Sequence, residues 1–515
     1  MSDTSANNKR IAKNTLMLYF RMLLMMFIGL YTSRVILDKL GEVDFGIYNV
    51  VGGFVSIFVI ISGAMTTATQ RFLSFEIGKG ENGDVKGIFS TMLMIHIFLA
   101  AVIILAGETA GTWFLNHYMN FPPNRYGAAN WVFQFSLLVF VLNVINVPYN
   151  GALIAYEKMS AFAYFSIIDA VLKLAICYVI VITPFDRLIV YAALMALVQI
   201  ALIAAYYLYC RKKFPECRFI GKFNRQYSKK VTSFVGWNLI GSLAGAAKDQ
   251  GVNIVINIFF GPAVNAARGI AYQVLSKING FVSNFQMAMN PQIIKNYAVG
   301  NLDAMYRLVF RGAKISFLLL FTLSLPVIIE APLILDLWLK EVPNYTVIFL
   351  RLAIMTALLD TISNPLTISM QASGIVRNYQ IVVCSISLLT LPLVYIAFKI
   401  GLAPYSAMIV TIIVEFFCHF ARLYMLKRNI KFPMTEYLKK VTLVIIVITL
   451  VSVIPPIIVY NLVEGTVVQF FSVCIMSLFS SLSFGFYIGF NSYERKKILY
   501  KAKAIVRDKL GKHTK

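Results

Sequence analysis

The chain has 515 residues, of which 59% are hydrophobic and 14% are charged, and its mean hydropathy is +0.74. Soluble domains are less apolar, and hydrophobic segments of about twenty residues recur along the whole chain, so the composition excludes a soluble protein and indicates a polytopic α-helical membrane protein. A β-barrel would show short segments of alternating polarity instead. Lys and Arg outnumber Asp and Glu by 47 to 23, which gives a net charge of +24.

Hydrophobic spans follow one another from the N-terminus. The first ten residues, MSDTSANNKR, are polar, and no small-residue cleavage site follows the first span, so we expect that span to remain as an anchor. Each of fourteen predicted spans can cross the roughly 30 Å hydrocarbon layer. They are 11–37, 44–69, 85–107, 129–155, 160–183, 187–210, 231–258, 265–290, 308–335, 345–370, 376–399, 403–427, 439–461 and 466–490.

The basic residues are distributed unevenly between the two sides of these spans. With the N-terminus on the inner side, the inner segments hold 34 Lys and Arg residues and the outer segments hold 5. Such a bias predicts that both termini are cytoplasmic. It also accounts for the net charge without a nucleic-acid partner. Residues 491–515 carry Ile498, Leu499, Ile505 and Val506 at helical spacing among lysines, which predicts a basic amphipathic helix on the anionic inner leaflet.

The basic segment 211–230 divides the predicted spans into two groups. We predict an N-lobe of six helices and a cytoplasmic linker, followed by a C-lobe of six helices, two further helices and the tail. The corresponding ranges are 1–210, 211–230, 231–430, 431–490 and 491–515.

The two groups resemble each other in sequence. Four polar, Pro or Ala positions recur at a separation of 217, and a glycine that follows a span recurs at 220. The pairs are Asn143 and Asp360, Asn146 and Ser363, Pro148 and Pro365, Ala155 and Ala372, and Gly41 and Gly261. Six helices per copy keep both copies in one orientation, so the pattern predicts parallel repeats of the kind found in transporters. We expect two lobes that face each other across a central cavity.

Charged residues lie deep within several spans, where each costs about 2.5–3.5 kcal/mol on insertion scales unless it faces a polar interior. Lys248 and Asp249 lie in 231–258, Lys277 lies in 265–290, and Arg21 lies in the first span. Arg34 and Arg268 lie nearer the outer ends, where their side chains could instead extend to the interface. Five cations and one acid in these three spans predict a net cationic pathway, for which a phosphate is a natural cargo.

Polar side chains also form stripes. Asn143, Asn146 and Asn150 share one helical face, and Asp360 lies in a similar stripe. These groups could contact sugar hydroxyls or join helices to one another. We expect Pro148 and Pro365 to kink their helices.

Two i, i+4 pairs of ionisable groups lie within spans. Glu415 and His419 could carry protons or form a buried structural pair, and with Asp249 they are candidates for ion coupling. Asp169 and Lys173 form a self-neutralising pair.

Motifs for energy conversion and metal chemistry are missing. GKGENGDVKG (78–87) lacks the phosphate-loop pattern, so no ATP motor is encoded. The six cysteines have no metal-site or disulfide spacing, and we interpret them as core residues. We therefore expect no cofactor, no metal and no catalytic residue.

Three segments resemble a known family: NTLMLYFRMLLMMFIGLYTSRVILDKLGEVDFGIYNVV (14–51), PYNGALIAYEKMSAF (148–162) and GPAVNAARGIAYQV (261–274). They are similar to the polysaccharide-type lipid flippases of the multidrug/oligosaccharidyl-lipid/polysaccharide exporter superfamily, the O-antigen and capsule repeat-unit translocases. The resemblance implies a bacterial inner-membrane protein that flips polyprenyl-diphosphate-linked oligosaccharides by alternating access for lipopolysaccharide or exopolysaccharide synthesis. It also implies glycan polymerase or export proteins as partners, while the basic linker and tail predict contact with anionic membrane lipids.

The family's cavity carries cations on helices 1, 2, 7 and 8. Arg21, Lys248 and Lys277 match that placement, whereas no cation lies deep in span 44–69.

Two alternatives stay open. A cation-coupled drug antiporter of the same superfamily would favour an acidic cavity. A membrane glycan polymerase or ligase would need an outer catalytic segment, for which 108–128, with His117 and Arg125, is the candidate.

Overall fold

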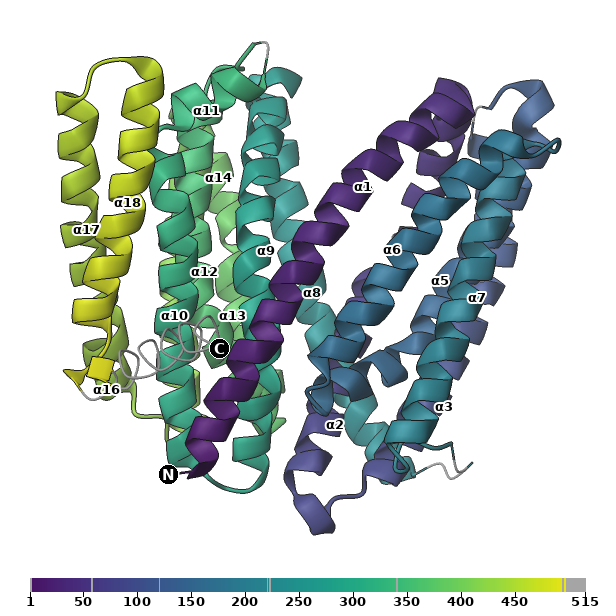
Figure 1. The fold of residues 1–515 in the computed structure, drawn as a ribbon, viewed down its shortest axis with the longest axis horizontal. Coiled ribbons are helices and arrows are strands. Elements are labelled where there is room, and N and C mark those ends of the chain that lie inside the picture. Colours follow the sequence, from purple (N-terminus) through teal and green to yellow (C-terminus); the bar gives the residue numbers. More distant parts are fainter. Residues whose placement is uncertain are drawn as a thin grey trace, which may run out of the picture. The chain divides into compact units, whose positions relative to one another are not determined.

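The computed structural model describes residues 2–56, 59–119, 121–219, 221, 224–339, 341–492 and 495–496, and all its regular structure there is helical (Figure 1). The α-helices of the first half are α1 (Ser2–Ser56), α2 (Val59–Gly78), α3 (Val85–Ala106), α4 (Thr112–Tyr118), α5 (Tyr126–Ala155), α6 (Met159–Ile182) and α7 (Arg187–Lys213). Those of the second half are α8 (Arg225–Phe260), α9 (Pro262–Ala298), α10 (Leu302–Ile329), α11 (Ala331–Trp338), α12 (Thr346–Ser373), α13 (Arg377–Leu388), α14 (Thr390–Lys399), α15 (Ser406–Ile430), α16 (Met434–Tyr437), α17 (Leu443–Leu462) and α18 (Thr466–Gly489). The predicted polytopic, all-helical class is confirmed.

Each of the fourteen predicted spans coincides with helix in the described residues. The first two spans lie in α1 and α2, and the backbone of α1 breaks at Gly41, where φ is 79°. The predicted span 376–399 is divided into α13 and α14 at Leu389. The outer segment 108–128, expected to be a loop, is largely helical instead, because α3 continues through a π-helical turn at Gly107–Gly111 into α4. Most of the predicted tail helix lies outside the described residues.

Among the described residues, eleven helical segments are long and apolar enough to cross a membrane. α8 and α9 have 36 and 37 residues, but they are not among these eleven. Their polar side chains, which include Lys248 and Lys277, lower their hydropathy. Helices of this composition need neighbours that shield their polar faces from lipid.

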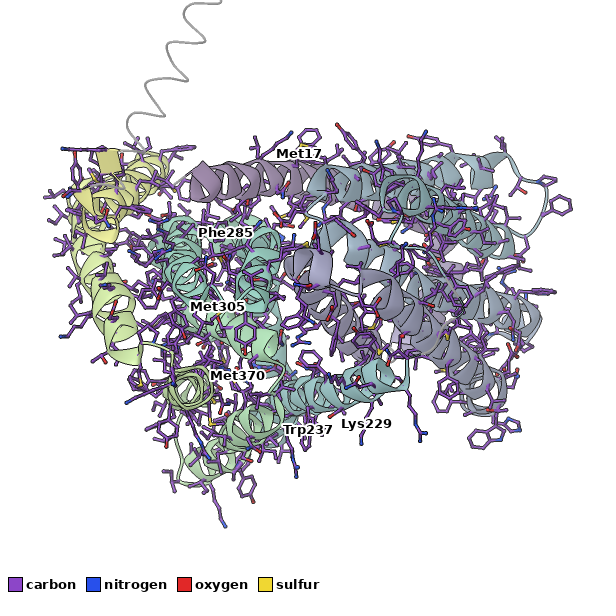
Figure 2. All side chains as sticks on the ribbon, turned by 90° about the horizontal axis from the view of Figure 1, so that it is seen from below. Met17, Lys229, Trp237, Phe285, Met305 and Met370 are labelled. Atoms are coloured by element: carbon purple, nitrogen blue, oxygen red, sulfur yellow. The ribbon has the colours of Figure 1, made fainter. Side chains whose placement is uncertain are left out.

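The chain forms two compact units. Unit 1 contains residues 1–243, 287–305 and 371–380, and unit 2 contains 244–286, 306–370 and 381–515. α9 and α12 therefore each contribute to both units, since the chain passes between the units at 286–287 and at 370–371. Figure 2 labels Phe285 and Met370, which lie at or next to these crossings, and Met305, which borders a further crossing at 305–306.

Unit 1 is built around α5, which packs against α2, α3 and α7, while α1 packs against α6. Gly151 of α5 allows the close approach of α2, because a Cβ at this position would lie 2.7 Å from the Thr69 methyl group. A second buried cluster joins Ile36 of α1 to Ile176 and Ile180 of α6 and to α7. The interior of the unit is apolar side-chain packing, which fixes the positions of its few polar groups.

In unit 2, α17 and α18 form an adjacent helical pair (Figure 1). Gly485 of α18 brings α10 close, since a Cβ there would lie 2.9 Å from Leu318 Cδ2. Lys314 of α10 donates a hydrogen bond of 2.6 Å to the Gly489 carbonyl at the end of α18. A separate buried cluster joins α8, α14 and α15 through Val252, Ile256 and Val394.

The backbone supports the predicted internal repeat. Gly41 and Gly261, matched at a separation of 220, both have a φ of 79°. The same separation relates Gly80 (φ 62°) to Gly300 (φ 73°). Glu157 (φ 59°) and Gly374 (φ 77°) are 217 apart, which is the separation of Pro148 and Pro365. Left-handed backbone is uncommon, so its recurrence at these separations is strong support for two copies of one helical plan.

Candidate functional site

The most polar site of unit 2 is a buried ion cluster between α8 and α15. Lys248 Nζ donates to Glu415 Oε1 at 2.8 Å, and Arg422 Nη1 lies 3.4 Å from Glu415 Oε2. The Lys248 side chain is 13% exposed and the Glu415 side chain 7%. Lys248, for which we predicted a phosphate contact, is therefore engaged by a carboxylate within its own unit.

Two further acids lie within electrostatic range of this cluster. Asp360 of α12 interacts with Glu415, Arg422 and Lys248, and Asp249 interacts with both Lys248 and Asp360. Both aspartates are exposed. Acids of α12 and α15 thus balance the charge of Lys248 on α8, which the prediction of a net cationic pathway had not included.

Arg268 of α9 lies beside this cluster and is only 6% exposed. Its guanidinium donates to Asn253 Oδ1 of α8, and it stacks over Tyr272, with 4.6 Å between the guanidinium carbon and the ring centre. Asn265 donates a hydrogen bond of 2.9 Å to the Asn253 carbonyl. The expectation that Arg268 extends to the interface is wrong, because these neutral groups hold it inside the unit.

Lys277 follows Arg268 by nine positions, which at about 100° per residue places the two on opposite faces of α9. Lys277 is exposed, as are its neighbours Gln273 and Ser276. No acid among the residues that the structure describes forms an ion pair with Lys277 or Arg268. The side chain of Arg34, the remaining predicted cation near an outer end, lies outside the described residues.

Arg21 belongs to unit 1. Its Nη1 donates to Ser166 Oγ of α6 at 3.3 Å, and its guanidinium lies over the Phe162 ring, 4.5 Å from the ring centre. The predicted pair of Asp169 and Lys173 on the same helix is confirmed, with 2.7 Å between Oδ2 and Nζ.

The asparagine stripe of α5 divides into two kinds of environment. Asn143 accepts a hydrogen bond of 2.9 Å from Gln199 of α7, so it joins two helices. Asn146 is buried and Asn150 half-buried, and the side-chain oxygen of each has no hydrogen-bond partner in the described part of the chain. Of the three, Asn146 and Asn150 retain acceptor capacity.

Glu415 and His419 have different partners. Whereas Glu415 faces Lys248, His419 Nδ1 lies 2.9 Å from Ser363 Oγ of α12, and the ring is 2% exposed. The direct carboxylate–imidazole pair that the spacing allows is replaced by two interhelical contacts.

The outer residues considered for catalysis make contacts within unit 1. Arg125 is bound by two carboxylates, Asp44 on the second part of α1 and Asp186 before α7. His117 stacks on Trp113 with ring centres 5.6 Å apart, and its Nδ1 lies 2.9 Å from the Trp113 carbonyl. Arg125 and its two carboxylate partners thus tie together three outer segments of unit 1.

The sequence analysis missed Arg422, Asn253 and Tyr272. Arg422 follows Glu415 by seven residues, two helical turns, so their shared face was a usable signal. Within the described ranges, no group of three or more His, Cys, Asp or Glu side chains could hold a metal ion. Five of the six cysteines are buried, and all six are free thiols.

A family model named MatE matches residues 18–179. A comparison with curated protein sequences finds no match. An outward-facing multidrug-resistance MATE family transporter of the MOP superfamily superposes with a TM-score of 0.71 at 13% identity, covering 83% of this chain and 97% of that one. A Vibrio cholerae MATE transporter in the bent form gives a TM-score of 0.68 at 15% identity, covering 85% and 100%.

A MOP superfamily transporter from Pyrococcus furiosus, described as having a binding pocket of reverse polarity that suggests a different function, gives a TM-score of 0.66 at 14% identity. The match covers 83% of this chain and 96% of that one. At these identities the likeness establishes the fold, which is the two-lobed fold of the MATE transporters.

Proposed function

We propose that this chain is a transporter that flips polyprenyl-diphosphate-linked oligosaccharides from the cytoplasmic to the outer leaflet of a bacterial inner membrane. It would work by alternating access and serve the synthesis of O-antigen, capsule or exopolysaccharide. The fold it shares with MATE transporters and its many membrane-capable helices support transport as the general activity. The separate description of a reverse-polarity pocket in one protein of this fold is consistent with a cargo other than an organic cation.

The observation that carries this proposal is the cation content of α9. Lys277 is exposed at the middle of a helix whose apolar positions predict membrane burial, and Arg268 is held by neutral partners. A cation at this depth without an acidic counterpart is costly unless an anion or water reaches it. A diphosphate offers Lys and Arg donors charge-assisted hydrogen bonds. We assign Lys277 as the first phosphate contact, with Arg268 and Arg21 as further candidates.

The cluster around Lys248 has a different proposed role, which is ion coupling. Asp249 and Asp360 are exposed carboxylates beside a buried ion pair, so a proton or a cation could reach them. Binding there would change the charge balance with Lys248 and Glu415. On this proposal, Asp249 and Glu415, two of the predicted coupling residues, act in one group, and Lys248 acts in coupling in place of phosphate binding.

The test is lipid translocation in proteoliposomes that contain a short polyprenyl-diphosphate oligosaccharide, with the sugar detected by a membrane-impermeant lectin. Lys277→Met should lower translocation about 10- to 100-fold, since a hydrogen bond to a charged group is worth about 1.5–3 kcal/mol. Lys399→Met, which removes an exposed lysine at the end of α14, is the matched control and should be neutral. Equal translocation by Lys277→Met and wild type would reject the assignment.

One observation favours a second candidate, an organic-cation antiporter. The exposed acids Asp249 and Asp360 could bind a cationic drug, and two of the structural relatives described above are named as MATE transporters. In that case, wild type would drive ion-coupled efflux of an organic cation, Asp360→Asn would abolish this efflux, and the lectin assay would give no signal above empty liposomes.

A further inference from the structure

Two turns at matched positions of the repeat lie in unit 1. One follows α5 and contains Glu157, and the other follows α12 and contains Gly374. Both residues have left-handed backbone, which costs a residue with a Cβ about 1–2 kcal/mol. A glutamate at the first of these positions therefore needs compensating contacts, and those of its carboxylate come from the other half of the chain.

The first clamp holds Glu157. Lys295 Nζ lies 2.5 Å from its Oε1, and Gln292 Nε2 donates to its Oε2 at 2.7 Å. Asn14 of α1 donates to the Glu157 carbonyl at 3.2 Å. The Glu157 side chain is 0% exposed. A carboxylate removed from water in this way is stable only while these donors stay in place.

The second clamp holds the turn at Gly374. Arg71 of α2 donates from Nε to the Gln371 carbonyl at 3.1 Å and from Nη2 to the Ala372 carbonyl at 2.9 Å. Its guanidinium carbon lies 4.4 Å from the centre of the Phe72 ring. A Cβ at Gly374 would lie only 2.9 Å from Arg71 Nη2. Left-handed backbone therefore favours glycine here, and a Cβ would also press on the arginine.

The two clamps are reciprocal. In one, the end of α2 from the first half holds the turn after α12, and in the other, the end of α9 from the second half holds the turn after α5. The helix ends also touch directly, since a Cβ at Gly78 would lie 2.8 Å from Lys295 Cα and 3.0 Å from Ala298 Cβ. Each half of the chain thus supplies one helix end and one turn.

We infer that these two clamps form a reciprocal latch, which fixes segments 287–305 and 371–380 to the first half of the chain in one state of the transport cycle and releases them in another. The inference rests on the proposed alternating access. The distribution of Lys and Arg predicts that the latch is cytoplasmic. Its chemistry suits repeated opening to water, because separated charges regain hydration whereas separated apolar surfaces do not.

Glycine substitutions test the second clamp. Gly374→Ala adds both backbone strain and a collision with Arg71, whereas Gly300→Ala adds only strain, since nothing lies within 4 Å of its Cβ position. The reporter is Ser74→Cys, at a fully buried position of α2, in a background in which the six native cysteines are replaced. Maleimide labelling of the full-length purified protein, without cargo, should be roughly tenfold faster in Gly374→Ala than in Gly300→Ala, because two charge-assisted hydrogen bonds are disturbed.

Charge exchange tests the first clamp. Glu157→Lys and Lys295→Glu should each raise the labelling rate at least roughly tenfold, and the double variant should return it to within about threefold of wild type. Equal rates in the two alanine variants, or a double variant no slower than the single ones, would overturn the latch. Because no cargo is present, these results do not depend on which substrate is transported.

A disulfide keeps the inference testable if a clamp variant does not fold. In the cysteine-free background, Gly78→Cys with Ala298→Cys should cross-link on oxidation, because the two Cβ atoms would lie 3.0 Å apart and a small shift of the helix ends, which the 2.8 Å approach to Lys295 Cα also requires, brings them to disulfide distance. The cross-link should stop translocation of the polyprenyl-diphosphate oligosaccharide, or efflux of an organic cation if that is the cargo, and a reductant should restore it. Unchanged transport by the cross-linked protein would overturn the latch.

Discussion

Replacement of Lys248 by Met should destabilise unit 2, because it leaves Glu415 buried without its closest partner. Breaking a buried ion pair from one side costs about 3–5 kcal/mol. Arg422, 3.4 Å from the other carboxylate oxygen, remains to compensate for part of the lost charge. We therefore expect a loss at or just below the lower end of that range, about 2–3 kcal/mol in the free energy of unfolding.

The informative measurement is a double-mutant cycle. Glu415→Gln alone leaves Lys248 facing a neutral amide, and the double variant Lys248→Met Glu415→Gln removes both charges at once. Residues in contact usually show a coupling energy of about 0.5–3 kcal/mol, so the double variant should lose less stability than the sum of the single variants. The free energy of unfolding is measured in mixed micelles by protease susceptibility. The difference between wild type and each of the three variants then gives the coupling energy.

Additive losses within about 0.5 kcal/mol would refute the reasoning, because they would mean that the two charges do not interact. Lipid translocation measured on the same variants separates the structural role of Lys248 from its proposed role in coupling. If Lys248 and Glu415 act in coupling, translocation stays lost in the double variant even where its stability recovers.

Two further predictions concern packing and pH. Gly251→Ala should destabilise the protein by about 1–3 kcal/mol, because its Cβ would lie 2.5 Å from Leu391 Cδ2, whereas Gly245→Ala, with nothing within 4 Å, should be neutral or stabilising in thermal unfolding. Partial burial alone would raise the pKa of Asp186, but hydrogen bonds from Arg125 and from backbone amides lower it below its usual value. The ionised Asp186 carboxylate therefore stabilises the folded state above the unfolded pKa of about 3.9, and this stabilisation disappears as the pH falls through the lower folded pKa. Unfolding measured between about pH 6 and pH 2 should therefore be less pH-dependent in Asp186→Asn than in wild type; identical slopes would contradict this.

The helices could be predicted from sequence because hydropathy and the bilayer thickness set their length. Fourteen spans follow from local composition, and Gly41 and Gly261 mark breaks that need left-handed backbone. The matched left-handed pair of Glu157 and Gly374 was not predicted, since no propensity places a glutamate there and its contacts come from residues 135 and 138 positions away.

The site was harder to predict because charge balance depends on contacts that are distant in sequence. Lys248 and Glu415 are separated by 167 residues, and neither residue's own span indicates the other. Arg268 was expected at the interface because only its position along α9 was known, not the amide of Asn253 that receives it. The depth of a charge follows from the sequence, but its partner follows from packing.

The polarity of α8 and α9 has a consequence for synthesis. Elongation at about 5–20 residues per second places Glu415 on the chain roughly 10–30 seconds after Lys248. During that interval α8 is a poor candidate for independent insertion, and its lysine lacks the carboxylate that later neutralises it. We expect α8 and α9 to enter the bilayer late or together, as a hairpin turned at Gly261 and Pro262, once more apolar neighbours have been made. Biogenesis of this protein would then depend on an insertion machinery that retains α8 and α9 until α12 and α15 have been synthesised.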